Sequence, residues 1–302
     1  MQPDLLEIEA PASLPDKQIE ALAGQFMDDS HFDLLVSGNT VVKKPDGTPL
    51  LMYQDNALSR RLCNTAYDVF SKVAFHSANR GMAAGRVDGH RTRARRLKRD
   101  GIPTRTTYPA AELRSGIVGF FDRYPRIPFC RMTAFNIDHA TEWDRALPFI
   151  RAVDRTFAVG APDRYAAQRK MVNGISRDFT IHGTAFTTLT VNQTFRTALH
   201  VDKGDYRQGF GVLSVLEAGS YTGGYLVFPK YRVAVDMRTG GVLLADVHEA
   251  HGNTEIKGEP GQHVRLSLVF YARARMTACG SASEELARAK RLGAGAPRMA
   301  RV

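Results

Sequence analysis

The strongest constraint on the fold of this chain is a set of metal-ligand side chains that lie far apart in the sequence. His200 and Asp202 are separated by one residue, and His251 follows 49 residues after Asp202. In a β-strand, residues i and i+2 point to the same face, so His200 and Asp202 can share one ion. Several strand-like runs separate this pair from His251. The chain must therefore bring distant strands together around one cavity.

From about residue 178 onward, short apolar runs alternate with turn signals rich in glycine and proline. The runs cover residues 179–191, 211–216, 225–228, 233–236, 242–247, 254–256 and 264–272. Many short strands at near-regular spacing are typical of a sandwich or a barrel. Together with the ligand pattern, they predict an α+β protein with a mainly β core, in which a double-stranded β-helix (a jelly-roll or cupin-like barrel) carries N-terminal helices packed on it.

The part of the chain before residue 178 has a different texture. We expect a loosely structured lead-in over residues 1–30 and a hairpin over 33–53, and apolar spacing of three or four residues predicts helices over 56–76 and 142–158. The predicted organisation is one catalytic domain made of a lead-in and hairpin (1–55), a helical and basic-loop support region (56–175), the β-helix core (176–275) and a basic C-terminal tail (276–302).

The ligand types indicate the chemistry. Two imidazoles and one carboxylate form the facial triad that leaves open positions on Fe(II), where a 2-oxo acid and O2 can bind. His248 competes with His251, because Asp246-Val247-His248 also places a carboxylate and an imidazole at i and i+2. We favour His251, which stands where the next strand begins. Arg265 opens the last strong strand and offers a planar cation to a second carboxylate, with Ser267 on the same face.

Charge predicts the class of partner. The chain has a formal net charge of +10 at pH 7, which favours a polyanion such as nucleic acid. The residues that we expect to contact phosphate are Arg91, Arg93, Arg95, Arg96, Lys98 and Arg99, within a basic stretch over 86–105, and Lys203 and Arg207 near the predicted metal ligands. A disordered basic tether is the alternative interpretation of the stretch.

The three cysteines and the N-terminus bear on the compartment. Cys63, Cys130 and Cys279 are odd in number, far apart and without a C-x-x-C pair, which predicts neither a disulfide framework nor a zinc site. No apolar run approaches the roughly 20 residues that a membrane span needs. No secretory signal is visible at the N-terminus. We expect a cytoplasmic or nucleoid-associated protein, and no membrane partner.

Four stretches resemble the TET/J-binding-protein branch of the Fe(II)/2-oxoglutarate dioxygenases, including viral and algal members. They are Asp178-Phe179-Thr180-Ile181-His182-Gly183-Thr184-Ala185-Phe186, His200-Val201-Asp202-Lys203-Gly204-Asp205, Gly223-Gly224-Tyr225-Leu226-Val227-Phe228-Pro229 and Asp246-Val247-His248-Glu249-Ala250-His251-Gly252-Asn253-Thr254. The similarity is strong over about 110–275. It also raises the expectation that the protein is virus-encoded.

The resemblance implies an enzyme that hydroxylates the 5-methyl group of a pyrimidine, 5-methylcytosine or thymine, in DNA whose base is flipped into the pocket. It implies Fe(II), 2-oxoglutarate and O2 as cofactors and co-substrates, and His200, Asp202 and His251 as iron ligands. Arg265 becomes the co-substrate anchor, and Asn192 and Arg196 become further cofactor contacts.

Four alternatives stay open at this point. Some algal relatives use ascorbate and transfer a glyceryl group to methylcytosine. The same iron chemistry can act on RNA or a nucleotide, or on a protein side chain. A β-helix protein without activity can also bind nucleic acid. No obligate protein partner is evident in the sequence.

Overall fold

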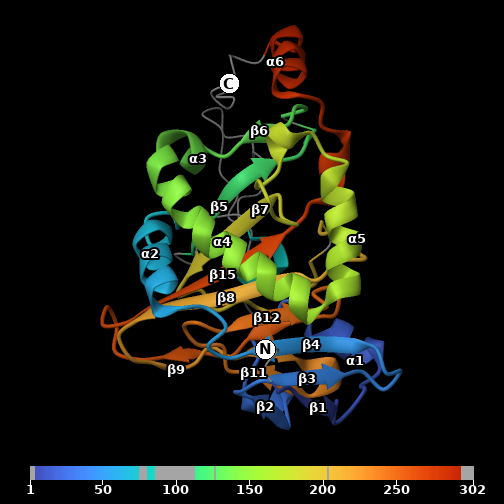
Figure 1. The fold of residues 1–302 in the computed structure, drawn as a ribbon. Coiled ribbons are helices and arrows are strands. Elements are labelled where there is room, and N and C mark those ends of the chain that lie inside the picture. Colours follow the sequence, from blue (N-terminus) through green and yellow to red (C-terminus); the bar gives the residue numbers. More distant parts are fainter. Residues whose placement is uncertain (1–3, 75–79, 86–112, 126, 203, 294–302) are drawn as a thin grey trace, which may run out of the picture.

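The computed structural model describes residues 4–74, 80–85, 113–125, 127–202 and 204–293. Lys203 and the whole predicted basic stretch fall outside these residues. In the described part, two β-sheets face each other and a layer of helices covers the outer face of the larger sheet (Figure 1). This is the mainly β, helix-covered arrangement that the sequence predicts.

Nine strands form the large sheet. In spatial order they are β1 (Leu6–Glu9), β3 (Thr40–Lys43), β4 (Pro49–Gln54), β12 (Val242–Ala245), β8 (Gly211–Ala218), β15 (Val264–Tyr271), β7 (Thr188–Gln193), β5 (Arg114–Phe121) and β6 (Arg131–Met132). The four-stranded sheet runs β13 (Gly252–Asn253), β10 (Leu226–Phe228), β11 (Val233–Val235) and β2 (Leu34–Val36), and β9 (Thr222–Gly223) pairs with β14 (Ile256–Lys257).

The central strands of the large sheet are buried on both faces, and their side chains divide between two cores with a period of two. In β8, Val212 and Leu216 pack toward the helices, whereas Leu213 and Val215 pack toward the four-stranded sheet. Because successive side chains of a strand point to opposite faces, a nearly continuous apolar run suits such a position. The second core, between the two sheets, closes the double-stranded β-helix.

Six α-helices are described: five contribute to the core that covers the outer face of the large sheet, and the first packs through Ile19 against the four-stranded sheet. They are α1 (Asp16–Leu22), α2 (Arg60–Phe70), α3 (Ala134–Asp138), α4 (Ala140–Gly160), α5 (Pro162–Asn173) and α6 (Ala282–Arg291), with short 3-10 helices at Asp29–His31, Gly81–Ala84, Arg177–Phe179, Pro229–Tyr231 and Ala274–Ala278. The predicted helices over 56–76 and 142–158 are confirmed as α2 and α4, although α2 ends at Phe70. Among the described residues, no helix has both the length and the apolarity to cross a membrane.

Two predictions about local structure are wrong. The lead-in is not loose, because β1 pairs in parallel with β3 and α1 follows it. The run over 179–191 forms a strand only from Thr188, and a 3-10 helix ends at Phe179 before it. In both places the local pattern was misleading because partners distant in sequence decide the structure. A hairpin does lie within 33–53, but its first strand is β3, because the expected first strand at Leu34–Val36 is β2, which pairs with β11 in the other sheet.

The prediction that no disulfide forms is also wrong. Cys130 and Cys279 are bonded across a sequence separation of 149 residues, and Cys63 is free and buried. Cysteine spacing along a chain does not show which thiols meet in space. The fold returns the segment after β15 to the turn before β6, where the buried carboxylate of Glu285 also accepts hydrogen bonds from the Cys130 amide and from Arg123.

Candidate metal centre and its pocket

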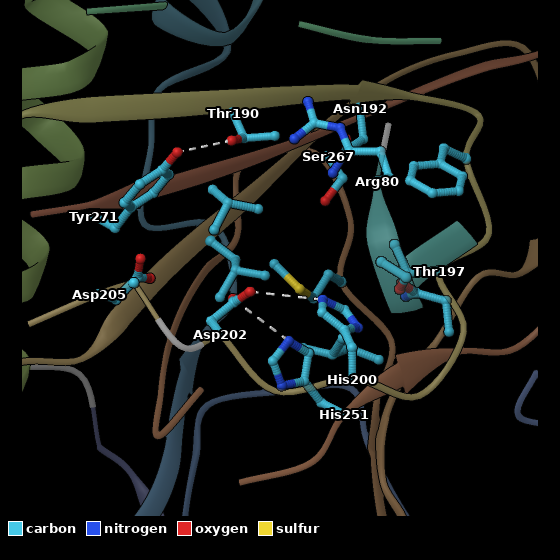
Figure 2. Close-up of a pocket in the computed structure, with 18 of the residues that line it drawn as sticks. Arg80, Thr190, Asn192, Thr197, His200, Asp202, Asp205, His251, Ser267 and Tyr271 are labelled. Carbon is cyan, nitrogen blue, oxygen red and sulfur yellow. Dashed lines mark hydrogen bonds and ion pairs between the residues drawn. The ribbon is translucent and has the colours of Figure 1, made fainter. Parts of the chain in front are cut away.

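The structure brings together the three predicted metal ligands. The ligand atoms of His200, Asp202 and His251 all lie within 4.8 Å of one another. Each imidazole presents Nε2 to one oxygen of Asp202, His200 to Oδ1 at 3.7 Å and His251 to Oδ2 at 3.7 Å (Figure 2). Among the described residues, this is the one group of three or more histidine, cysteine or acidic side chains close enough to hold an ion.

Main-chain hydrogen bonds set the spacing of this cluster. His200 and His251 stand directly opposite each other, and each amide donates to the other's carbonyl at 2.9 Å. The Asp202 amide donates to the Val247 carbonyl at 3.2 Å. The two segments are therefore paired in the manner of antiparallel strands. This pairing brings into contact ligands that are 49 residues apart in the sequence.

The imidazoles are oriented for metal binding. Nδ1 of His200 lies 2.8 Å from the Ala198 carbonyl, and Nδ1 of His251 lies 2.9 Å from the Glu249 carbonyl. A carbonyl only accepts, so each Nδ1 carries the proton and each Nε2 keeps its lone pair for an ion. Burial, together with the neighbouring His200, lowers the pKa of His251 to about 4, so this imidazole is neutral at physiological pH.

His248, the competing ligand, does not join the cluster. It lines a separate hollow of about 700 Å³ between α1 and the segment before His251, in which Lys230 and Glu249 also take part. His200 and Asp202 line both this hollow and the pocket described next. His251 is therefore the distal member of the cluster.

The cluster opens into a pocket of about 280 Å³ inside the β-helix. Arg265, Ser267 and Asn192 line the same pocket. Figure 2 shows Asn192 and Ser267 across the pocket from the histidines. All three side chains come from the adjacent strands β7 and β15, in which Ser267 pairs with Asn192. One cavity thus holds a metal-ligand set and a permanently charged cation.

Arg265 is buried without a full set of partners. Its residue is 3% exposed, and its Nε has no hydrogen-bond partner among the described residues. Its main chain is held by Thr194, whose amide donates to the Arg265 carbonyl at 2.7 Å. Gly224 leaves room for the side chain, because a Cβ built there would lie 3.3 Å from Arg265 Nε. An unpaired buried guanidinium that faces a cavity is suited to an anionic ligand.

Comparison with known proteins assigns the site to a family. A family model described as the oxygenase domain of the 2OGFeDO superfamily, Tet_JBP, matches residues 116–274, which is more than half of the chain. The chain belongs to the Tet/JBP family of 2-oxoglutarate and Fe(II)-dependent dioxygenases. The matched region contains all three candidate metal ligands and Arg265.

Two curated relatives and one solved structure show the similarity. The chain is 42% identical over 167 residues to thymine dioxygenase JBP1 of Trypanosoma brucei brucei, covering 54% of this chain and 19% of JBP1. It is 31% identical over 272 residues to the bifunctional helicase and thymine dioxygenase JBP2 of the same organism, covering 84% of this chain and 24% of JBP2. The chain thus spans about a fifth to a quarter of these relatives.

The structure of NgTET1 in complex with 5mC DNA superposes with a TM-score of 0.59 and 15% identity, covering 92% of this chain and 86% of NgTET1. At this identity the likeness shows the fold alone, and it confirms the double-stranded β-helix.

The residues present fit the cofactors of the Tet/JBP family. The family implies Fe(II) and 2-oxoglutarate. Two imidazoles and a carboxylate are a suitable donor set for Fe(II). The unpaired Nε of Arg265 is a suitable partner for the distal carboxylate of 2-oxoglutarate.

The other predicted site residues of this Tet/JBP oxygenase are placed differently. Arg196 does not line the pocket, because its guanidinium donates to the carbonyls of Met27 and Asn253 and lies over the Phe26 ring. Asn192 lines the pocket but accepts a hydrogen bond from Ser115. Arg207 is exposed on the loop after Asp202. Lys203 and the arginines and lysine predicted over 91–99 lie outside the described residues.

Several pocket residues were missed from the sequence. They are Arg80, Thr190, Asp205, Tyr271 and Arg273. The period of two was the available signal, since Arg265, Ser267, Val269 and Tyr271 alternate along one face of β15, as Thr190 and Asn192 do on β7.

Asp205 and Arg273, two of the missed residues, are ionisable groups. Burial, with the nearby charge of Asp202, raises the pKa of Asp205 well above its usual value. Arg273 pairs with Asp122 at 2.8 Å.

Proposed function

We propose that this chain hydroxylates the 5-methyl group of a pyrimidine in DNA, with Fe(II), 2-oxoglutarate and O2, and that thymine is its first substrate. The observation that carries the proposal is the sharing of one pocket by His200, Asp202, His251 and Arg265. The choice of thymine rests on the relatives that are thymine dioxygenases. Fe(II) held by these ligands would supply the oxidising chemistry, in which O2 and 2-oxoglutarate give succinate, CO2 and the hydroxylated methyl group.

In this proposal, the chain's own residues prepare the pocket. The three ligands would hold the metal, and main-chain carbonyls already orient the two imidazoles among them. Arg265 binds the distal carboxylate of the co-substrate through its fork of N–H donors, and Ser267 adds a hydroxyl from the same face of β15.

A methyl group stacked inside a duplex cannot reach a pocket of this kind, so the base must leave the stack at a cost of a few kcal/mol. Polar side chains are available to hydrogen-bond to the edge of a flipped pyrimidine. Asp205, Tyr271 and Arg273 line the pocket together with the metal ligands. Figure 2 shows Asp205 and Tyr271 on the side of Asp202 that faces away from the histidines.

The proposed grip on DNA is electrostatic. The net charge of +10 supports a polyanionic substrate, and the predicted phosphate contacts are the basic residues over 86–105 with Lys203 and Arg207. If they neutralise several phosphates, binding must fall steeply as salt rises. Neutralising the arginines at 91, 93, 95 and 96 together should flatten this salt dependence, and an unchanged slope would remove the stretch from the interface.

The test is nucleoside mass spectrometry after aerobic incubation with Fe(II), 2-oxoglutarate and duplex DNA. The first duplex carries thymine and no 5-methylcytosine. The matched duplex carries 5-methylcytosine at the positions that thymine occupies in the first. We expect 5-hydroxymethyluracil from the first duplex, together with succinate. Product from methylcytosine alone would replace thymine as the substrate. Succinate without either base product would leave the cofactor chemistry intact and direct the search to RNA, nucleotides or protein. An ascorbate arm without 2-oxoglutarate tests glyceryl transfer.

A further inference from the structure

We propose that Lys44 is a positioning residue of the metal centre, which fixes the segment that carries His251 and so sets the affinity for the metal. Lys44 lies 207 residues before His251 and outside the region matched by the family model. The inference rests on the metal site of the proposed function, and it is independent of the identity of the base.

The first observation is a partly buried cluster of one ammonium and two carboxylates. The Lys44 ammonium donates to Asp246 Oδ2 at 2.7 Å and to Glu249 Oε1 at 2.8 Å. The side chain of Lys44 is 12% exposed, and those of Asp246 and Glu249 are 16% and 20% exposed. One cation from the turn between β3 and β4 therefore holds both acidic residues of the segment 246–251.

The second observation is that this segment is otherwise a tight turn that ends on the metal ligand. The Asp246 amide donates to Leu50 of β4, and the Glu249 amide donates back to the Asp246 carbonyl at 3.0 Å. The Glu249 carbonyl then accepts the Nδ1 hydrogen of His251 at 2.9 Å. The residue whose side chain is held by Lys44 thus orients the His251 ring through its main chain.

A third contact restrains the same carboxylate. The Tyr231 hydroxyl donates to Glu249 Oε1 at 2.7 Å. Lys230, whose ammonium is 2.7 Å from Asp16, lies 4.0 Å from Glu249 Oε2. Glu249 is therefore bound on several sides, and Lys44 is the partner that it shares with Asp246.

The electrostatics explain why the cation matters. Burial lowers the pKa of Lys44, but its hydrogen bonds to the two carboxylates outweigh burial and raise the pKa overall, so the ammonium stays charged. Without it, two partly buried carboxylates three residues apart would repel each other. Their remaining partners among the described residues would be the His248 amide on Asp246, and Tyr231 and Lys230 on Glu249. The turn would then open, and the Glu249 carbonyl would no longer fix the ring of His251.

The experiment is an anaerobic titration of the full chain with Co(II), followed by its visible absorbance, in Lys44→Met, Lys44→Arg and the matched control Lys43→Met. Lys43 is the neighbour on β3, and it pairs at the surface with Glu7. Partners outside the ligand set typically change metal affinity by roughly 10- to 100-fold. We expect Lys44→Met to weaken Co(II) binding about 10-fold or more, Lys44→Arg to recover most of it, and Lys43→Met to bind as the wild type does.

A second readout separates positioning from general damage. In Lys44→Met the Fe(II) concentration needed for half-maximal succinate release should rise, while kcat at saturating Fe(II) and the KM for 2-oxoglutarate stay near wild type. Tyr231→Phe, a milder change to the same carboxylate, should give a smaller loss of the same sign if Lys44→Met fails to fold.

Two results would overturn the inference, and they are distinguishable. Equal Co(II) affinity of wild type and Lys44→Met would refute the role of Lys44 and leave the metal site standing. Failure of the wild type to bind Co(II), or equal binding by Asp202→Ala, would refute the metal site and the positioning role together.

Discussion

The two ends of the pocket are built in opposite ways. At the metal end, each imidazole donates from Nδ1 to a main-chain carbonyl, and the segments that carry His200 and His251 are hydrogen-bonded to each other. At the other end, Arg265 is as deeply buried as His251, yet its Nε has no partner among the described residues. The imidazoles at the metal end therefore have hydrogen-bond partners within the protein, whereas Arg265 Nε at the cationic end needs a ligand as its partner.

This difference indicates that the cationic end contributes most directly to the free energy of co-substrate binding. A buried, incompletely paired charge destabilises the ligand-free chain, because its desolvation is not offset by hydrogen bonds. A dianionic co-substrate removes that penalty when it binds. Changes at the metal end should therefore alter geometry and activity, and changes at the cationic end should alter stability and affinity in opposite directions.

The largest effect is expected at the metal end. Asp202→Ala removes the one carboxylate between the two imidazoles, and we expect metal binding and succinate release to be abolished. The Asp202 side chain is 31% exposed, so the fold should persist. Anaerobic Fe(II) titration and succinate assays measure the loss, with Asp144→Ala on the exposed face of α4 as the control. Turnover retained in Asp202→Ala would refute the ligand assignment.

At the cationic end, Arg265→Met should raise the KM for 2-oxoglutarate by roughly 10- to 100-fold, the value of a charged hydrogen-bonded contact. Arg265→Lys should be intermediate, because it keeps the charge and loses the planar fork. The melting temperature of ligand-free Arg265→Met should equal or exceed that of the wild type, since an unpaired buried charge has gone. A large fall in melting temperature with an unchanged KM would contradict this prediction, because it would mean that Arg265 stabilises the fold and does not bind the co-substrate.

The protonation of His251 gives a third prediction. Burial lowers the pKa of His251 to about 4, below its ordinary value of 6.5, so the unfolded chain binds more protons between these values. The contribution of His251 to stability is therefore present above about pH 6.5 and is lost as pH falls toward 4, by at most about 1.4 kcal/mol per pH unit. Chemical denaturation of the metal-free protein across this range should show that slope in the wild type, and His251→Gln should lack it.

The smallest effect tests the space around Arg265. Gly224 has a φ of +70°, and a Cβ there would lie 3.1 Å from Ile256 and 3.3 Å from Arg265 Nε. Gly224→Ala should raise the KM for 2-oxoglutarate a few-fold. Gly47 is the matched control, with a φ of +78° and nothing within 4 Å of its Cβ position. Both variants should lose about 1 kcal/mol of stability from left-handed backbone, and only Gly224→Ala should change KM. Equal KM values for Gly224→Ala and the wild type would show that the Arg265 side chain can shift away from the added methyl group without weakening co-substrate binding.

The sequence was sufficient to predict the site residues that are spaced two apart, as side chains on one face of a strand are. His200 and Asp202 lie two apart, and Arg265 and Ser267 lie two apart at the start of the last strand, so their shared faces were predictable. The same rule extended along β15 would have found Tyr271. Apolar spacing also predicted α2 and α4, because each helix has a wide apolar face that packs on the large sheet.

The parts that the sequence did not reveal depend on partners with no local signature. The ion cluster of Lys44 joins residues 202 and 205 apart, and a single lysine after a strand looks like any surface cation. The Cys130–Cys279 bond and the parallel pairing of β1 with β3 are of the same kind. Arg196 was expected in the pocket, but its guanidinium donates to the main-chain carbonyl of Met27. No pattern in the sequence predicts this contact.

The mutual backbone pairing of His200 and His251 has a consequence for which metal the protein carries. Two main-chain hydrogen bonds hold the backbones of His200 and His251 opposite each other, so the two segments have little freedom to move apart for a larger ion. The adjustment is left to Asp202, which is more exposed and can bind through one oxygen or two. Imidazole and carboxylate donors hold Co(II), Ni(II) and Cu(II) more tightly than Fe(II). Chain exposed to several of these ions is therefore expected to hold one that binds more tightly than Fe(II), unless Fe(II) is supplied in excess.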